Sequence, residues 1–411
     1  MPTKNFYDVL AQRGLVAQAT DENPRQRFEQ PITAYNGFDA TADSLHIGHL
    51  VPLLCLAQLQ RCGHRPVVLL GGATTLVGDP TDRLDSRPML SRDVIEQNAR
   101  RIEEQVQRIL RFDDTDSGAI LVNNIDWIGP LNWLELLRDI GAHFSVNWML
   151  KLDSVRSRLE AGGLTFLEFN YMVLQAYDFV HLHRTYECTI QTGAQDQWGN
   201  IVAGVELARR MDGASLGGLT YPLLLKSDGS KFGKSSSGTV WLSAERTPPY
   251  ELYQYLRNTP DADVTRCLAM LTLLPADELR RLGELSTGQI NEAKEILAYE
   301  VTRLIHGDAE AHSARDSSRR AFGADRDFDG DAIPHTIIRT TELSDLRAMM
   351  VRAGLSSSNS DAKKLIQGGA VRLGNEQVTD IRRIITGQDV TEGHILIRIG
   401  KKRVFRFDIE D

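Results

Sequence analysis

The sequence predicts an α/β protein whose N-terminal half folds as a doubly wound parallel sheet. Short apolar stretches at residues 31–35, 64–72 and 119–124 alternate with segments at 47–57 and 92–112 in which apolar residues recur at helical spacing. The run at 64–72 is continuous rather than alternating, which is typical of a strand buried on both faces. Strands and helices that alternate in this way form parallel sheets, whose ligands bind beyond the carboxyl ends of the strands.

The first strand leads through a turn into the first long helix. Residues 31–35 are apolar and turn-prone, and Asp43 and Ser44 follow with side-chain oxygens suited to capping a helix. The apolar repeat of that helix begins at Ile47. We therefore expect the helix to start near Ser44, at the ligand-binding edge of the sheet.

Two histidines occupy the start of this helix. His46 and His49 lie three residues apart and so share one face, where free amides and the helix dipole favour an anion. Gly48 lies between them and would let a flat ring approach the backbone. The alternative is a solvated helix face. A metal site is the weaker interpretation, because no nearby cysteine or carboxylate completes a ligand set.

The segment 71–80 follows the second strand and is rich in glycine and threonine. It lacks the Lys-Ser/Thr ending of a Walker loop and the glycine spacing of a dinucleotide-binding turn. We interpret it as a turn that carries Asp79 into the cleft. The alternative is that Asp79 only forms an Asx turn before Pro80.

The alternation of predicted strands and helices is interrupted at about residues 127–160. Apolar helical segments containing Trp133, Leu134 and Val146 occupy this range and suggest an inserted helical region with exposed surface to bury. Such a surface often forms a subunit contact, so we predict a homodimer.

A strongly apolar helix is expected at residues 166–179. Tyr171, Gln175 and Asp178 fall on one face of it, at positions i, i+4 and i+7. Polar groups on an inward face are costly unless they are satisfied, which indicates either a ladder of internal hydrogen bonds or an amphipathic pocket for a small molecule. A strand at 188–191 and a turn at 192–197 then lead to another helix at Trp198.

A loop rich in glycine and serine follows a strand near residue 223. It carries Lys226, Lys231 and Lys234. Such a loop is often only flexible and solvated, but lysines on a mobile loop can also close over a polyphosphate.

The length, net charge and cysteine content of the chain limit the class of protein to which it can belong. A chain of 411 residues is expected to form two or three domains. The net charge of −8 argues against coating nucleic acid over the whole surface, while a local basic patch stays possible. The four cysteines have neither zinc-site nor disulfide spacing, and no segment has signal-peptide or membrane-spanning character. We expect a cytoplasmic protein with no membrane partner.

Two signatures and the residues between them point to a family. His46-Ile47-Gly48-His49, at a strand-to-helix turn, resembles the HIGH signature of class I aminoacyl-tRNA synthetases, and the stretch from Lys231 to Ser235 resembles their KMSKS signature. The stretches 35–49, 170–178 and 196–200 are similar to bacterial-type tyrosyl-tRNA synthetases in particular, and the similarity extends over essentially the whole chain.

The resemblance implies a domain organisation. Residues 1–225 would form a Rossmann-like catalytic domain, with the helical insertion at about 127–160 as its dimer contact. Residues 226–322 would carry the KMSKS loop and an α-helical domain beside the anticodon arm, residues 323–342 a linker, and residues 343–411 a small α+β, S4-like RNA-binding domain. The RNA-binding candidates in that last domain are Arg347, Arg352, Lys363, Lys364 and Arg372.

The resemblance also implies roles for site residues. Residues that would bind the substrate tyrosine are Tyr35 and Asp178 at its phenolic hydroxyl, Asp79, Tyr171 and Gln175 at its ammonium group, and Asp39 and Gln197 near its carboxylate and the ribose. Residues that would bind ATP are Gly37, Asp39, His46, Gly48, His49, Gly193, Asp196, Lys231, Lys234 and Ser235. Residues that would meet the reacting phosphates or close on them are Thr41, His46, His49, Arg83, Arg87, Lys231 and Lys234.

The implied reaction needs no nucleophilic side chain. The carboxylate of L-tyrosine attacks the α-phosphate of ATP, pyrophosphate leaves, and the terminal ribose of tRNA(Tyr) then takes the acyl group. Positioning and electrostatic stabilisation suffice for such a transfer. Mg²⁺ would accompany ATP, held mainly by phosphates and water, and we expect no tightly bound cofactor and no metal site made by the protein.

Two other functions are compatible with parts of this pattern. A tryptophanyl-type synthetase shares the class and the fold, but it should lack a Tyr and Asp pair aimed at a phenol. A synthetase-derived RNA-binding protein, for example in splicing, would not need the intact histidines and lysines. The chain also departs from the family at Asn36, where several relatives have a small thiol residue, and at Pro52 and Ala194.

Overall fold

The computed structural model describes residues 4–81, 89–235, 238–286, 288–322, 334–374, 376–400 and 403–410. The chain forms two compact units. The first contains Met1–Ser243 and Thr265–Leu285, and the second contains Ala244–Val264 and Ser286–Asp411. The lysine-bearing loop belongs to the first unit, whereas the sequence grouped it with the helices that follow.

The first unit is built on a six-stranded sheet. Its strands are β1 (Gln18–Ala19), β2 (Thr33–Asp39), β3 (Arg65–Gly71), β4 (Ile120–Asn123), β5 (Cys188–Ala194) and β6 (Gly217–Tyr221), in the spatial order β1-β6-β5-β2-β3-β4. All neighbouring strands are parallel except β1 and β6. The predicted doubly wound sheet is confirmed. The antiparallel edge strand β1 was not predicted, because two residues are too short to show a pattern.

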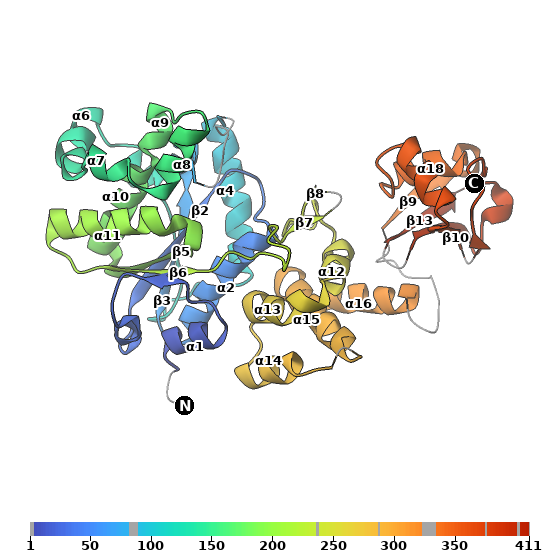
Figure 1. The fold of residues 1–411 in the computed structure, drawn as a ribbon, viewed down its shortest axis with the longest axis horizontal. Helices are drawn as coiled ribbons and strands as arrows, with labels where there is room; N and C mark the ends of the chain where they lie inside the picture. Colours follow the sequence, from blue (N-terminus) through green and yellow to red (C-terminus); the bar gives the residue numbers. More distant parts are fainter. Residues whose placement is uncertain are drawn as a thin grey trace. The chain divides into compact units, whose positions relative to one another are not determined.

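Helices of the first unit lie on both faces of this sheet (Figure 1). The helices of this unit are α1 (Phe6–Gln12), α2 (Ile47–Arg61), α3 (Gly72–Val77), α4 (Arg92–Gln107), α5 (Ile125–Ile128), α6 (Trp133–Glu135), α7 (Val146–Met149), α8 (Asp153–Ala161), α9 (Phe166–Phe169), α10 (Tyr171–Tyr186), α11 (Trp198–Asp212) and α14 (Ala276–Gly283). Figure 1 shows α10 and α11 on one face and α2 and α4 on the other. Tyr35 and Leu69 of the sheet pack with Phe179 of α10 and Leu207 of α11 in one buried apolar cluster.

Three local predictions were wrong in detail. The N-cap of α2 is His46, whose Nδ1 accepts from the amide of Gly48 at 3.1 Å, whereas the Ser44 hydroxyl accepts from the amide of Ser243 at 3.0 Å. Residues 72–77 form the helix α3 instead of a turn. The expected helix at 166–179 is split at Asn170 into α9 and α10. The hydrogen bond that caps α2 at His46 is invisible to apolar periodicity.

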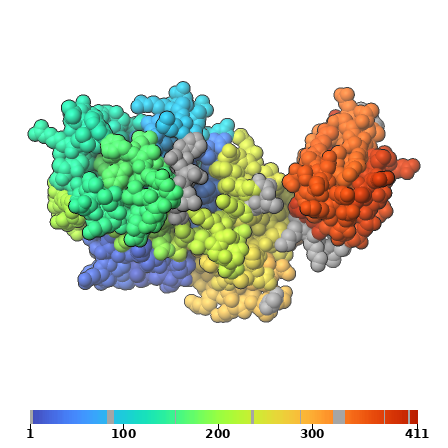
Figure 2. Space-filling view, turned by 45° about the horizontal axis from the view of Figure 1, so that its top comes forward, coloured from blue at the N-terminus to red at the C-terminus, as the bar shows by residue number. Residues whose placement is uncertain are grey.

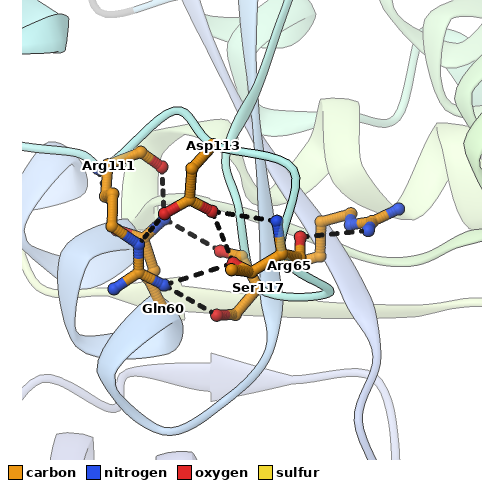
Figure 3. Close-up of polar contacts among 6 residues, drawn as sticks. Gln60, Arg65, Arg111, Asp113 and Ser117 are labelled. Carbon is orange, nitrogen blue, oxygen red and sulfur yellow. Dashed lines mark hydrogen bonds and ion pairs between the residues drawn. The ribbon is translucent and has the colours of Figure 1, made fainter.

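The connection between α4 and β4 is held by side chains of α2 and β3 (Figure 3). The Gln60 amide donates to the carbonyls of Arg111 and Ser117, at 2.7 and 2.8 Å, and its oxygen accepts from the amide of Arg111 at 3.0 Å. Arg65 donates to the carbonyl of Asp116 at 2.9 Å. This cluster fixes the approach to β4 at the amino ends of the strands, opposite the ligand-binding edge.

The second unit contains helices and a second sheet. The helices that the sequence placed in this region are α12 (Pro249–Arg257), α15 (Ile290–His306) and α16 (Asp308–Phe322), while α13 (Asp261–Leu271) contains the boundary between the units. The C-terminal part has α17 (Leu346–Arg352), α18 (Asn359–Gln367), β9 (His335–Arg339), β10 (Val371–Leu373), β11 (Glu376–Gln377), β12 (His394–Ile399) and β13 (Arg403–Glu410).

The C-terminal sheet has the strand order β11-β10-β12-β13-β9 and packs its apolar side chains with those of α17 and α18. β9 falls within residues 323–342, for which the sequence predicted a linker, and it pairs in parallel with β13. Only Ile338 of β9 is buried, so the strand lacks the apolar alternation that would have marked it. None of the helices in the described part of the chain has the length and apolar character needed to cross a membrane.

Candidate functional site

The candidate site lies where the sheet order reverses. β2 lies between β3 and β5, so the chain leaves β2 toward one edge of the sheet and returns on its other side at β5. Two cavities open at the carboxyl ends of these strands, of about 230 and 780 Å³. Residues that line both cavities include Asp39, His49 and Asp196, so the two adjoin.

The smaller cavity collects the residues predicted to bind tyrosine. All seven of them line it: Tyr35, Asp39, Asp79, Tyr171, Gln175, Asp178 and Gln197. They come from β2, from the segment after α3, from one face of α10 and from the turn after β5. Gly37 and Gly193, predicted to bind ATP, line the same cavity.

One of the tyrosines that line this cavity has a hydroxyl with no hydrogen-bond partner among the described residues. The Tyr35 side chain is buried, and its hydroxyl makes no hydrogen bond with any residue that the structure describes. Burial, with Asp178 close by, raises the pKa of Tyr35 well above its usual value, so the hydroxyl keeps its proton. A buried, unpaired hydroxyl at the end of a cavity is typical of a group that bonds to a ligand.

Asp178 is held beside Tyr35 by two residues that the sequence analysis missed. The Asn124 amide donates to Oδ2 of Asp178 at 3.0 Å, and the Trp127 indole donates to Oδ1 at 2.8 Å. Trp127 in turn stacks on His181, with ring centroids 4.3 Å apart. Burial raises the pKa of Asp178 to about 8, while the two hydrogen bonds favour the ionised form and oppose that rise. Nothing in the local sequence marks Asn124 or Trp127, because both follow β4 and meet α10 only through the sheet.

The polar wall of the smaller cavity is a connected network. The Tyr171 hydroxyl donates to Oδ2 of Asp39 at 3.0 Å. The Gln197 amide donates to Oδ2 of Asp79 at 2.8 Å, and Gln175 donates to the oxygen of Gln197 at 3.4 Å. These two carboxylates give this wall negative charge, which suits an ammonium group. Asp79 also accepts from the amide of Thr81 at 2.9 Å, so it forms an Asx turn as well as lining the cavity.

The two histidines lie face to face at the start of α2. Their ring centroids are 3.8 Å apart and the planes differ by 12°, so the prediction that they share one face is confirmed. Burial lowers the pKa of His46 and nearby Lys231 lowers it further, which keeps the ring neutral and able to accept the Gly48 amide. A Cβ on Gly48 would lie 2.9 Å from Cε1 of His46, so any larger residue here would have to displace the His46 ring.

The segment that carries the lysines is docked against α2 by its backbone. The amide of Ile47 donates to the carbonyl of Val240 at 3.0 Å, and the amide of Leu242 donates to the carbonyl of Leu45 at 2.8 Å. Gly233, at φ +101°, packs so closely that a Cβ there would lie 2.6 Å from Cγ2 of Ile47. The two signatures, remote in the sequence, therefore meet at one helix N-terminus.

Residues of both signature sequences line the larger cavity. Among the predicted residues, Thr41, His46, Gly48, Lys231 and Lys234 line it together with Asp39, His49 and Asp196. Arg83 and Arg87 lie outside the described residues, as does the side chain of Ser235, whose backbone belongs to the short hairpin of β7 (Lys234–Ser235) and β8 (Gly238–Thr239). In the part of the chain that the structure describes, no three His, Cys, Asp or Glu side chains are grouped to hold a metal ion.

The RNA-binding candidates are spread over the C-terminal fold. Lys363 and Lys364 are exposed on α18, and Arg372 is exposed on β10. Arg347 and Arg352 form ion pairs with Asp345 and Glu342, at 2.7 and 2.9 Å. Such surface pairs contribute only about 0–1 kcal/mol each, so a phosphate could compete for both arginines.

Known proteins resemble the chain over its whole length. Residues 26–323 match the family described as tRNA synthetases class I (W and Y), and residues 327–407 match the tyrosine–tRNA ligase SYY-like C-terminal domain. Tyrosine–tRNA ligases of Clostridium botulinum (strain Hall) and Clostridium tetani are each 46% identical over 409 residues. The aligned region covers 99% of this chain and 100% and 99% of the respective relatives.

Solved structures agree with the fold. A C-terminally truncated mitochondrial tyrosyl-tRNA synthetase of Aspergillus nidulans matches with a TM-score of 0.70 and 33% identity, covering 78% of this chain and 94% of that one. A tryptophanyl-tRNA synthetase of Encephalitozoon cuniculi, at 14% identity and a TM-score of 0.53 over 75% of this chain and 87% of that one, shares the fold. By the match over residues 26–323 and the identity to full-length relatives, the chain belongs to the class I tRNA synthetases of the tryptophan and tyrosine group.

Proposed function

We propose that this chain is a tyrosine–tRNA ligase that uses the two adjoining cavities for its two small substrates. L-tyrosine occupies the smaller cavity with its phenol at Tyr35 and Asp178, and ATP occupies the larger one between the histidines and the lysines. The assignment of tyrosine as the amino acid rests on the Tyr35 hydroxyl, which has no hydrogen-bond partner among the described residues and lies near the buried carboxylate of Asp178. An indole has no hydroxyl to meet the Tyr35 hydroxyl, and leaving that buried group without a partner would cost about 1–3 kcal/mol.

The proposed roles follow the geometry. Asp79, Tyr171 and Gln175 receive the ammonium group on the acidic wall, and Asp39 and Gln197 place the carboxylate. That carboxylate forms a bond to the α-phosphorus of ATP while the bond to pyrophosphate breaks. Lys231, Lys234 and the His46–His49 pair meet the charge on the phosphates, as preorganised groups do in phosphate chemistry. The tRNA ribose hydroxyl then attacks the acyl carbon, and AMP leaves.

Further elements of the proposal concern partners and location. Gly37, Gly48, Gly193 and Asp196 border the nucleotide, and Mg²⁺ enters with ATP, bound mainly by phosphates and water. The exposed basic residues of α18 and β10 contact tRNA phosphates, which position RNA without reading its sequence. The enzyme acts in the cytoplasm on tRNA(Tyr).

The reaction is tested by amino-acid-dependent exchange between ATP and labelled pyrophosphate. Exchange should require tyrosine, and the purified chain should then charge tRNA(Tyr). Exchange supported by tryptophan would contradict the assigned amino acid. Absence of exchange together with tRNA binding would instead identify a non-catalytic RNA-binding protein.

The homodimer is proposed from the surface of the insertion and of α9, which follows it. Trp133, Leu134, Val146 and Phe166 expose 52, 72, 57 and 67% of their area, and the rings of Trp133 and Phe166 pack edge to face, 6.1 Å apart. Figure 2 shows the stretch of chain that contains them, coloured teal to green, at the surface of the first unit. A second copy of the same face would bury this apolar cluster, because isologous contacts are the commonest in soluble oligomers.

Substitution of Phe166 by Asp should therefore yield monomers. Placing a charge at the centre of such a contact is expected to weaken dimerisation by at least about 30-fold. Sedimentation velocity over a concentration series measures this. Ile384→Asp, at a residue of the C-terminal fold that is 59% exposed, is the matched control and should leave the dimer intact. A wild-type chain that stays monomeric at micromolar concentration would contradict the proposal.

A further inference from the structure

The Trp127 side chain is held by two residues on one side of α10. Its indole N–H donates to Oδ1 of Asp178 at 2.8 Å, and its ring stacks on His181 with centroids 4.3 Å apart and planes that differ by 12°. Asp178 and His181 lie three residues apart on α10, so they project from the same side of that helix. The helix therefore contacts the edge of the indole with one side chain and its face with another.

The stack and the hydrogen bond constrain the same ring. An N–H hydrogen bond is strong only when the acceptor lies nearly in line with the N–H, and the N–H of an indole lies in the plane of the ring. Whatever fixes the plane of Trp127 therefore fixes how well its N–H points at Asp178. A second ring packed flat against the indole fixes that plane, and His181 packs in this way.

The other donor to Asp178 is fixed differently. Asn124 is fully buried and is also bonded to α3. Its oxygen accepts from the amide of Ala73 at 2.7 Å, and its nitrogen donates to Oγ1 of Thr74 at 3.1 Å. Trp127 instead lies on α5, a single turn in which no residue is buried. The orientation of Trp127 therefore depends on its stacking partner more than the orientation of Asn124 depends on any one contact.

We propose that His181 is a positioning residue for the recognition of tyrosine, acting through Trp127 on Asp178. Its ring holds the plane of the indole so that the N–H stays directed at the carboxylate that meets the phenol. Burial lowers the pKa of His181 and nearby Arg184 lowers it further, so the ring is neutral at about pH 7.5 and acts as a flat surface. Neither His181 nor Trp127 lines either cavity, so His181 acts on the substrate through Asp178. This inference rests on the proposed function.

His181→Ala should raise the KM for tyrosine in pyrophosphate exchange about fivefold, because the hydrogen bond to Asp178 is weakened but not removed. The KM for ATP and kcat should change less than about twofold. His181→Phe keeps a flat ring and should restore the wild-type KM for tyrosine. His183→Ala is the matched control. It removes the same ring from the same helix, at a position where Nδ1 lies 3.1 Å from the carbonyl of Cys188, and should leave the KM for tyrosine unchanged.

A double variant tests the route through Trp127. In a Trp127→Phe background no indole N–H remains to be directed, so His181→Ala should have no further effect on the KM for tyrosine, since residues that act through one contact are non-additive. Equal effects of His181→Ala in both backgrounds would overturn the proposal. A lowered melting temperature with an unchanged KM would overturn it too, as would failure of His181→Phe to restore the KM.

A measurement that needs no substrate separates this inference from the proposed function. In protein labelled with ¹⁵N-tryptophan, the indole N–H signal of Trp127 is identified by its loss in Trp127→Phe. This hydrogen should exchange with D₂O at least about fivefold faster in His181→Ala than in the wild type or in His181→Phe. Unchanged protection would overturn the positioning role. A wild type without tyrosine-dependent pyrophosphate exchange would contradict the proposed function instead, so the two failures are distinguishable.

Discussion

Replacing Asp178 by Asn is expected to abolish most tyrosine-dependent exchange, lowering kcat/KM for tyrosine roughly 10²- to 10³-fold. Both carboxylate oxygens of Asp178 accept buried N–H groups, from Asn124 and Trp127. An amide in this place would turn its NH₂ group against one of those donors, and the carboxylate oxygen that would accept a hydrogen bond from the phenol would be lost. Steady-state exchange kinetics at several tyrosine concentrations measure the loss. Retention of near wild-type kcat/KM would show that Asp178 does not meet the phenol.

The same carboxylate should make tyrosine binding depend on pH. Burial raises the pKa of Asp178 from its usual value of 3.8 to about 8, so the folded protein binds a proton that the unfolded chain releases. The stability from this group is present below the usual value and is lost as pH rises toward 8. The Asn variant should lose this slope, which urea unfolding at pH 6 and 9 can measure. Tyrosine affinity in the wild type should rise over the same range, as the accepting carboxylate ionises.

Trp127→Phe is the matched control for this argument. It keeps a ring that can stack on His181 but removes the N–H that favours the ionised carboxylate. The pKa of Asp178 should therefore rise further, and the pH profile of tyrosine binding should move to higher pH. An unchanged profile would mean that another group controls it.

Lys234→Ala is the second substitution with a large expected effect. Lys234 lines the larger cavity on the segment docked to α2, opposite the histidine pair. Loss of one preorganised cation at the phosphates is expected to lower kcat for exchange roughly 10²- to 10³-fold, because the group acts on charge that develops as pyrophosphate leaves. Tyrosine affinity should not change, since the smaller cavity is untouched. Rapid-quench measurement of adenylate formation isolates this step.

Lys226→Ala provides the control for Lys234. It removes the same charge from the same segment, yet Lys226 does not line the cavity and its backbone only closes the turn at Ser230. Its effect on kcat should be less than about threefold. Equal losses in the two variants would show that general positive charge, and not the position of Lys234, supports the reaction.

The fold and most of the candidate site were open to prediction from the sequence. A short apolar stretch marked β2 and a continuous apolar run marked β3, helical spacing marked α2 and α4, and the order of the two signatures indicated the family. The seven residues assigned to tyrosine line one cavity because strand ends and single helix faces place them there together. Their roles in binding stay predictions until the variants are measured.

The tertiary structure decided which residues far apart in the sequence form hydrogen bonds with one another, and no local sequence pattern contains that information. Asn124 and Trp127 reach Asp178, Tyr221 reaches Asn36, and Val240 accepts from Ile47 only because strands and loops far apart in the chain become neighbours in the sheet. Periodicity reports which face of an element is buried, since that depends on residues a few positions apart. It carries no information on strand order, and strand order sets which buried polar groups meet. The sequence by itself therefore determined most of the long elements and the family, while the folded sheet determined the hydrogen bonds that orient the site.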